Sequence, residues 1–168
     1  MSEDSPAANP YGTPTTSGPR PIGRAQGATN RMVRTLLRIP GLSGVVGKRL
    51  ATLHVVGRKS GNTYDIPVAY TAHGQTLLIG TAQRPWVKNL ASGTPLTITR
   101  GGRPEQFDPI VHTEADEVLR LFEIIARDNK TNADYNGIDF DAEGNPNKAD
   151  IYQTWQQGGV VIELRPVR

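Results

Sequence analysis

The stretch LATLHVVGRKSGNTYDIPVAYT, residues 50–71, carries the clearest structural signal of the chain. Residues 50–56 and the residues from 64 onward alternate apolar and polar side chains, which is typical of two strands of a sheet. Between them, the segment GRKSG at residues 57–61 places two cations and a serine between glycines. Glycine permits the positive φ angles of a tight turn, and successive backbone N–H groups can then converge on an anion. The same segment is also compatible with a plain hairpin turn that carries solvated cations.

Short strands at close spacing, with few helices between them, are expected over most of the remaining chain. Gly74-Gln75 and Gly101-Gly102 separate neighbouring strands as hairpin turns do. A short helix is predicted over residues 85–91 and a longer one over 114–128, with Thr113 as its N-cap. These features predict a mainly β protein with a few helices, in which the strands form a small barrel. The expected strands are residues 50–56, 64–73, 76–82, 95–100, 103–112 and 159–164.

Prolines spread among glycine, serine, threonine and alanine leave the first part of the chain little apolar surface to bury. We expect residues 1–28 to form a disordered tail and residues 29–168 to form the single folded domain. Residues 30–38 have apolar side chains at helical spacing and arginines on the opposite face. Such a segment is commonly an ordinary surface helix, and it is also compatible with peripheral contact to an anionic membrane.

The composition excludes several classes of function. The 168-residue chain contains no cysteine, so disulfides, cysteine-ligated metal clusters and cysteine nucleophiles are ruled out. Its net charge of +3 is too small to indicate a nucleic-acid partner, and no apolar run is long enough for a transmembrane helix. The first residues also lack the basic start and apolar core of a signal peptide. We therefore expect a cytoplasmic protein, whose oligomeric state the sequence does not indicate.

Metal and hydrolytic chemistry receive little support. Oxygen-bearing side chains between Asp139 and Asp150 have nearly the spacing of a calcium-binding EF-hand loop. Glutamate at the fifth position, aspartate at the twelfth and the lack of a flanking helix pair argue against calcium, so no metal site is expected. The three histidines, His54, His73 and His112, have no nucleophile elbow near them and are interpreted as structural.

Several short motifs follow one another in a distinctive order. The turn at 57–61 is followed by Pro67-Val68, then by W-x-x-N-L at residues 86–90, and then by Tyr152-Gln153. In this order the chain resembles the deazaflavin-dependent nitroreductase and quinone reductase family over roughly residues 50–168. The resemblance implies a split β-barrel of the flavin-reductase-like kind. It also implies an oxidoreductase that transfers a hydride from reduced coenzyme F-420, an 8-hydroxy-5-deazaflavin, to a small hydrophobic acceptor such as a quinone, a nitro compound or an activated double bond.

The resemblance assigns roles to individual residues. Arg58 and Lys59 of the turn would grip the anionic tail of the coenzyme, and the segment from Ile79 to Arg84 would line the deazaflavin ring and phosphate. Tyr152 corresponds to a family tyrosine near the acceptor and would act as a proton donor or gate. Tyr64 stands where many relatives carry an arginine, which implies a different electron acceptor. The full set of implied cofactor-binding residues is Gly57, Arg58, Lys59, Ser60, Pro67, Thr81, Arg84, Trp86 and Asn89.

Two other interpretations remain open at the level of sequence. The same barrel could hold FMN instead of F-420, since both cofactors carry a phosphate near a planar ring. The cationic turn and the arginine-bearing segment 30–38 are also compatible with a non-enzymatic module that binds a ligand or a membrane surface. The coenzyme would supply the redox chemistry in either enzyme, which fits a chain that lacks an evident catalytic cluster.

Overall fold

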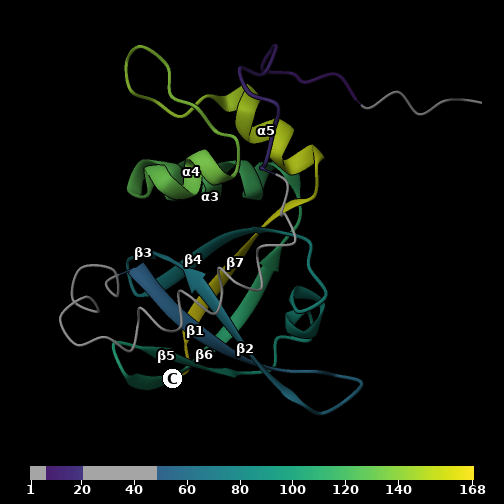
Figure 1. Cartoon of the computed structure of the whole chain (residues 1–168), viewed down its shortest axis with the longest axis vertical. Coiled ribbons are helices and arrows are strands. Elements are labelled where there is room, and N and C mark those ends of the chain that lie inside the picture. The colour runs from purple at the N-terminus through teal and green to yellow at the C-terminus, as the bar shows by residue number, and fades with distance from the viewer. Residues whose placement is uncertain (1–6, 21–48) are drawn as a thin grey trace, which may run out of the picture.

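The computed structural model describes residues 7–20 and 49–168 and shows a curled antiparallel sheet with helices packed at one end (Figure 1). All neighbouring strands are antiparallel, in the order β2-β1-β5-β6-β7-β4-β3. The expected mainly β fold is confirmed. The strands are β1 (Leu50–Val56), β2 (Thr63–Ala69), β3 (Thr71–His73), β4 (Thr76–Ala82), β5 (Leu96–Arg100), β6 (Arg103–His112) and β7 (Gly159–Pro166).

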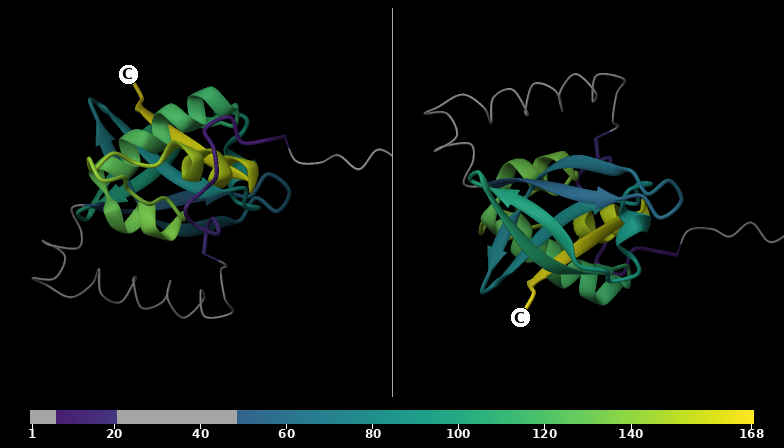
Figure 2. Two further views of the ribbon diagram at one scale, coloured as in Figure 1. Left: turned by 90° about the horizontal axis from the view of Figure 1, so that it is seen from above. Right: turned by 90° about the horizontal axis from the view of Figure 1, so that it is seen from below.

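The two edges of the sheet meet because the chain steps directly from one to the other. A single strand was expected over 64–73, but the structure breaks it at Tyr70 into β2 and β3. β2 pairs with β1 at one edge of the sheet, whereas β3 pairs with β4 at the other edge. Since only Tyr70 separates them, the sheet has to curl until its edges come together. The result is a split β-barrel, seen from below in Figure 2.

Strands β4 and β7 are buried on both faces, and this links two hydrophobic cores. Leu77 and Ile79 of β4 point into the barrel, whereas Leu78 points toward the helices. The same alternation is present in β7, where Ile162 faces the barrel interior and Val161 faces the helices. Gly80 allows the helices to approach closely, because a Cβ at this position would lie 2.6 Å from Phe122.

The helices are α3 (Ala115–Asp128), α4 (Lys130–Tyr135) and α5 (Lys148–Gln156), with a short 3-10 helix η2 (Val87–Leu90) beside the barrel. The predicted apolar face of α3 is confirmed, since Val118, Leu121, Phe122 and Ile125 are all buried. Its N-cap is Glu114 instead of the expected Thr113, and no side-chain bond caps this end. Helices α4 and α5 were not predicted. Polar residues at the start of α5 resemble a loop in sequence, but Asn147 caps the helix by accepting hydrogen bonds from the amides of Ala149 and Asp150.

Residues 7–20, here called the strap, run along α5 on the helix-covered end of the barrel (Figures 1 and 2). Asn9 donates to the carbonyl of Ala149 at 2.8 Å, and Thr15 donates its amide and its hydroxyl to the carboxylate of Asp150, both at 2.6 Å. The expectation of a disordered tail therefore does not hold for the strap. The contacts of the strap are polar, so the scarcity of apolar residues in this part of the sequence does not indicate whether it packs.

The remaining expectations for the N-terminal part lie outside the described residues. They concern residues 1–6, residues 21–28 and the arginine-bearing segment 30–38. The division into a tail and one folded domain stays a prediction. None of the helices in the described ranges is long and apolar enough to cross a membrane.

Candidate functional site

The GRKSG segment forms the expected tight turn at the end of β1. The amide of Gly57 donates to the carbonyl of Asn62, and the amide of Gly61 donates to the carbonyl of Gly57, each at 2.8 Å. Gly61 has a φ of 71°, which favours glycine. Gly57 also allows a close approach, because a Cβ there would lie 2.7 Å from the hydroxyl oxygen of Ser60, which would have to move. The turn is therefore closed on itself before any ligand binds.

The turn is held against η2, and this brings together two motifs that are distant in the sequence. The amide of Arg58 donates to the side-chain oxygen of Asn89 at 3.2 Å. Buried Val87 and Leu90 anchor η2 to the barrel, and Trp86 packs against the same core. Arg58, Asn89 and Trp86, three of the residues that the resemblance implies bind the cofactor, thus belong to one region of the structure.

The nest of amides expected in the turn is only partly available to an anion. The amides of Gly57, Arg58 and Gly61 already donate within the protein, and that of Asn62 donates to Ser60 at 3.2 Å. In the described structure, the amides of Lys59 and Ser60 have no such acceptor. An anion would therefore meet these two amides and the side chains, and not a continuous ring of N–H groups.

Positive charge gathers around this contact. Arg58 and Lys59 lie in the turn, Lys88 lies in η2 next to Asn89, and the carbonyl of Arg84 accepts the amide of Val87 at the start of η2. Among the residues that the structure describes, none of these four cations is paired with a carboxylate. Such unneutralised cations favour an anionic ligand such as a phosphate or a carboxylate.

The other implied cofactor residues are spread along the adjoining strands. Thr81 of β4 pairs with Val160 of β7, and Gln83, which follows β4, donates its amide to the carbonyl of Gly158 at 3.0 Å. Pro67 lies in β2 opposite Thr52. The segment from Thr81 to Asn89 thus runs from the end of β4 to the cationic turn.

Tyr152 lies elsewhere in the molecule, on α5. Its ring contacts Trp155 at a centroid distance of 5.2 Å and Tyr11 of the strap at 5.9 Å. Figure 1 shows α5 at the top of the view and the turn after β1 at the lower right. The structure therefore separates the predicted proton donor from the predicted anion site. Tyr11 could not be found from the sequence, because its segment has no apolar pattern.

A surface hollow of about 400 Å³ lies beside the C-terminal end of α5. It is lined by Gln83, by Trp155 and Gln156 at the end of α5, by residues 158–160, by Thr113 and by Ala7 of the strap. Trp155 is held in place because its indole N–H donates to the carbonyl of Thr113 at 2.9 Å. Sequence reasoning missed this hollow, because its walls come from separate parts of the chain.

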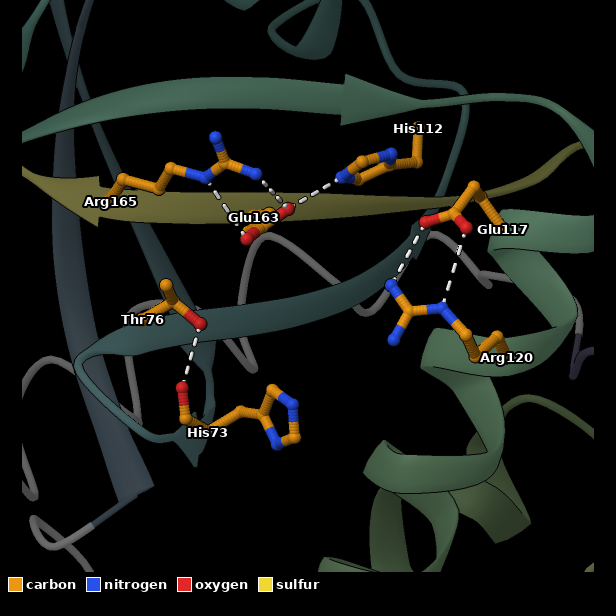
Figure 3. Close-up of polar contacts among 7 residues, drawn as sticks. All are labelled: His73, Thr76, His112, Glu117, Arg120, Glu163 and Arg165. Carbon is orange, nitrogen blue, oxygen red and sulfur yellow. Dashed lines mark hydrogen bonds and ion pairs between the residues drawn. The ribbon is translucent and has the colours of Figure 1, made fainter.

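The histidines interpreted as structural have partners on the sheet or in a turn. His54 lies between Asp65 at 2.7 Å and Thr99 at 2.8 Å, on neighbouring strands. Figure 3 shows His112 pointing at Glu163, with a separation of 2.8 Å between Nε2 and Oε2. His73 accepts the hydroxyl of Thr76 through its backbone carbonyl in the β3–β4 turn.

Glu163 is the centre of a partly buried charge cluster. Its side chain is 13% exposed and contacts both His112 and Arg165. Burial by itself raises the pKa of Glu163, but the hydrogen bonds from His112 and Arg165 outweigh burial, so the pKa is lowered overall. The cluster faces the N-terminal part of α3, where Glu117 and Arg120 form their own ion pair (Figure 3). The contacts of Glu163 join β6 and β7, the ion pair lies within α3, and neither involves a predicted cofactor residue.

The oxygen-rich loop from Asp139 to Asp150 uses its side chains to build local structure. Asp141 accepts the amide of Asn145 at 2.8 Å, and Asn147 caps α5. Asp150 is fully buried, and its carboxylate accepts hydrogen bonds from the strap and from the amide of Asp139. The described residues contain no group of histidines and carboxylates arranged for a metal ion. The absence of a calcium site stays a prediction, now with a physical reason.

Comparison with known proteins identifies the fold. No family model matches the sequence, and no curated protein matches it. The solved structure of an F-420-H2-dependent reductase, FDR-A, is 12% identical with a TM-score of 0.50, over 70% of this chain and 95% of that chain. A chain described as a domain-swapped dimer is 12% identical with a TM-score of 0.51, over 84% and 96%. An FMN-binding protein from Nostoc punctiforme, related to pyridoxamine 5′-phosphate oxidase, is 13% identical with a TM-score of 0.45, over 87% and 82%.

At such low identity the likeness establishes the fold alone. The protein has a split β-barrel fold, and the F-420-H2-dependent reductase is similar to it in fold. The fold likeness does not assign the activity of these proteins to this chain.

Proposed function

We propose that the protein is an oxidoreductase that binds the reduced deazaflavin coenzyme F-420 and passes its hydride to a small hydrophobic acceptor. The observation that carries the proposal is the contact between Arg58 and Asn89, because it gathers unpaired cations at the end of the segment that leads to the hollow. Quinones, nitro compounds and activated double bonds are the acceptor class that the sequence resemblance implies.

The residues present fit an elongated anionic cofactor. Arg58, Lys59 and Lys88 supply charge for a phosphate or carboxylate tail, and the amides of Lys59 and Ser60 supply donors. Six peptide units lead from Gln83 to Asn89, so the hollow and the turn contact are joined by at most about 20 Å of chain. A tail bound at the turn would allow a planar ring to lie along this segment toward the hollow.

Within this proposal the protein binds, orients and shields, and the coenzyme supplies the hydride when it is bound. The acceptor also needs a proton, because hydride addition leaves negative charge on its oxygen. Tyr152 is the proposed source of that proton. Its ring contacts Trp155, which lines the hollow, but Tyr152 itself does not line it. The phenol would therefore pass its proton to the acceptor through an intervening water molecule.

Direct titration tests the proposal against its closest rival. FMN has a phosphate and a planar ring, so the cationic turn is compatible with it as well. We expect purified protein to bind F-420 in the micromolar range or tighter and to bind FMN at least tenfold more weakly, as measured by fluorescence titration. If FMN bound more tightly than F-420, FMN would be the cofactor of this protein instead of F-420. If neither bound, the proposed redox function would be wrong.

Substitutions in the turn provide the first prediction. Arg58→Ala or Lys59→Ala removes a charge-assisted hydrogen bond worth about 1.5–3 kcal/mol, so each change is expected to weaken F-420 binding by about ten- to a hundredfold. Arg103→Ala removes an exposed cation at the start of β6 and serves as the control. Equal affinity in the wild type and in both turn variants would leave the segment as a plain hairpin turn.

A further inference from the structure

The hollow beside Trp155 has the features of a binding site for a neutral molecule. Its volume of about 400 Å³ lies within the range of small-molecule sites. None of the residues that line it carries a charge, in contrast to the cationic turn after β1. The indole of Trp155 offers a flat apolar wall, and the amides of Gln83 and Gln156 offer hydrogen-bonding groups.

The strap completes one wall of the hollow. Ala7 lines it, and the side chain of Gln156 donates to the carbonyl of Ala7 at 2.7 Å. Two residues further along, Asn9 donates to the carbonyl of Ala149 on α5. The strap is therefore attached to α5 on both sides of Ala8, at the edge of the hollow.

The buried carboxylate of Asp150 fixes the other half of the strap. It accepts both Thr15 hydrogen bonds and a longer one of 3.3 Å from the amide of Thr16. Asp150 is completely inaccessible to solvent. A buried carboxylate that lacks hydrogen-bond donors strongly destabilises a fold, so the hydrogen bonds from the strap to Asp150 are favoured. They hold the strap on α5, the helix that also carries Trp155.

We propose that the hollow binds the apolar acceptor and that Ala7 of the strap is part of its wall, so that this end of the strap helps to determine which acceptors fit. The occupant is a small, planar, uncharged molecule whose ring packs on Trp155 and whose oxygen accepts a hydrogen bond from a glutamine amide. Its identity as the hydride acceptor rests on the proposed function. Its binding to the hollow does not depend on the coenzyme.

Binding can be measured without coenzyme by the fluorescence of Trp155. The chain has two tryptophans, so Trp86→Phe leaves Trp155 as the only reporter. Titration with 1,4-naphthoquinone is expected to quench this fluorescence saturably. The 2-sulfonate of the same quinone is expected to bind at least about tenfold more weakly, because the walls of the hollow carry no cation to replace its hydration. Linear quenching without saturation would overturn the proposal.

Two variants in this background test the walls. Thr113→Phe adds a ring on the lining without removing a side-chain bond, and it is expected to raise the Kd by about tenfold or more. Gln156→Leu releases the carbonyl of Ala7 and is expected to raise the Kd by at least about threefold. Gln75→Leu makes the same chemical change in the exposed β3–β4 turn and is expected to leave the Kd within about twofold. If the Kd for the quinone were unchanged in both wall variants and their far-UV circular dichroism were that of the wild type, the quinone would bind outside the hollow and the proposal would be wrong.

The outcome is separable from the test of the coenzyme site. Saturable quinone binding in a protein that binds no F-420 would retain the hollow as a ligand site and remove the redox function. Tight F-420 binding without quinone binding at Trp155 would retain the coenzyme site and overturn the present inference.

Discussion

At the scale of single residues, a side chain acquires a role from what surrounds it. Arg58 would be an ordinary surface cation in an isolated hairpin. In the fold its amide is fixed on Asn89, next to Lys88 in the chain, and neither Arg58 nor Lys88 has a carboxylate partner in the described part of the chain. Repulsion among such cations costs stability, which an anionic ligand would recover on binding.

Tyr152 provides a prediction at this scale. Tyr152→Phe keeps the ring that packs between Tyr11 and Trp155 and removes the hydroxyl. We expect F-420 affinity to stay within about threefold and turnover to fall about tenfold or more, because proton donation to the developing oxyanion is lost. Steady-state and single-turnover kinetics with several acceptors would measure this. Tyr135→Phe is the matched control at an exposed tyrosine. Unchanged turnover would make Tyr152 a packing residue.

Glu163 provides a prediction about pH. Its folded-state pKa is lowered below the ordinary value of 4.5, so the ionised carboxylate stabilises the fold above about pH 4.5. This contribution is lost as the pH falls through the folded-state pKa. Glu163→Gln is therefore expected to cost about 1–2 kcal/mol at pH 7, and to flatten the loss of stability below pH 4.5.

Thermal unfolding between pH 3 and 7 would measure the effect of Glu163→Gln. A change of 1 kcal/mol corresponds to about 2–4 °C in a chain of this size. Glu114→Gln, at the start of α3, is the control, because its side chain does not cap the helix. Parallel pH curves for the wild type and Glu163→Gln would show that the cluster around His112 does not contribute.

At the scale of elements, the strap shows that a polar segment can be an integral part of a fold. Thr15, Thr16 and Asn9 donate hydrogen bonds to Asp150 and to the carbonyl of Ala149 on α5. Deleting residues 1–20 would leave the carboxylate of Asp150 with the amide of Asp139 as its remaining donor among the described residues. This segment therefore contributes to stability although it buries little apolar surface.

Thr15→Val tests the strap with a minimal change. It keeps the side-chain shape and removes the hydroxyl that donates to Asp150, and we expect a cost of about 1–3 kcal/mol. Urea denaturation would measure the stability, and hydrogen exchange would show faster exchange of the amides of residues 7–20. Thr13→Val makes the same change at an exposed position of the strap. Equal stability of the two variants would mean that the strap is bound only loosely.

At the scale of the whole molecule, the barrel interior and the helix layer depend on the same strands. β4 and β7 contribute side chains to both cores, with Leu78 and Val161 on the helix side. Because neither core can lose these strands and persist, the described domain is expected to unfold in one cooperative transition.

Gly80→Ala tests the coupling between the two layers. The new Cβ would lie 2.6 Å from the ring of Phe122, so the helix layer has to move, at a cost of about 1–3 kcal/mol. Phe122→Leu removes the ring atom in question, and the double variant is expected to be less destabilised than the sum of the single changes. Calorimetry and circular dichroism should show one coincident transition. Additive effects, or separate transitions, would contradict the coupling.

The elements that depend on neighbours along the chain could be predicted from the sequence. Alternating side chains define β1, an apolar run followed by glycine defines β4, helical spacing defines the buried face of α3, and glycines define the turn after β1. The order of motifs also indicated the split barrel and a set of cofactor residues, of which Arg58 and Asn89 are in contact. These signals are local, because periodicity and turn chemistry act over a few residues.

The features that depend on distant residues became visible only in the folded protein. α5 resembles a polar loop in sequence, and it is stabilised by Asn147 at its start and by the strap along its side. Thr15 and Asp150 are separated by 135 positions, so no local pattern connects them. The hollow beside Trp155 depends in the same way on parts of the chain that meet only after folding. The energy of these contacts lies in satisfying buried polar groups, which leaves no periodic signal in the sequence.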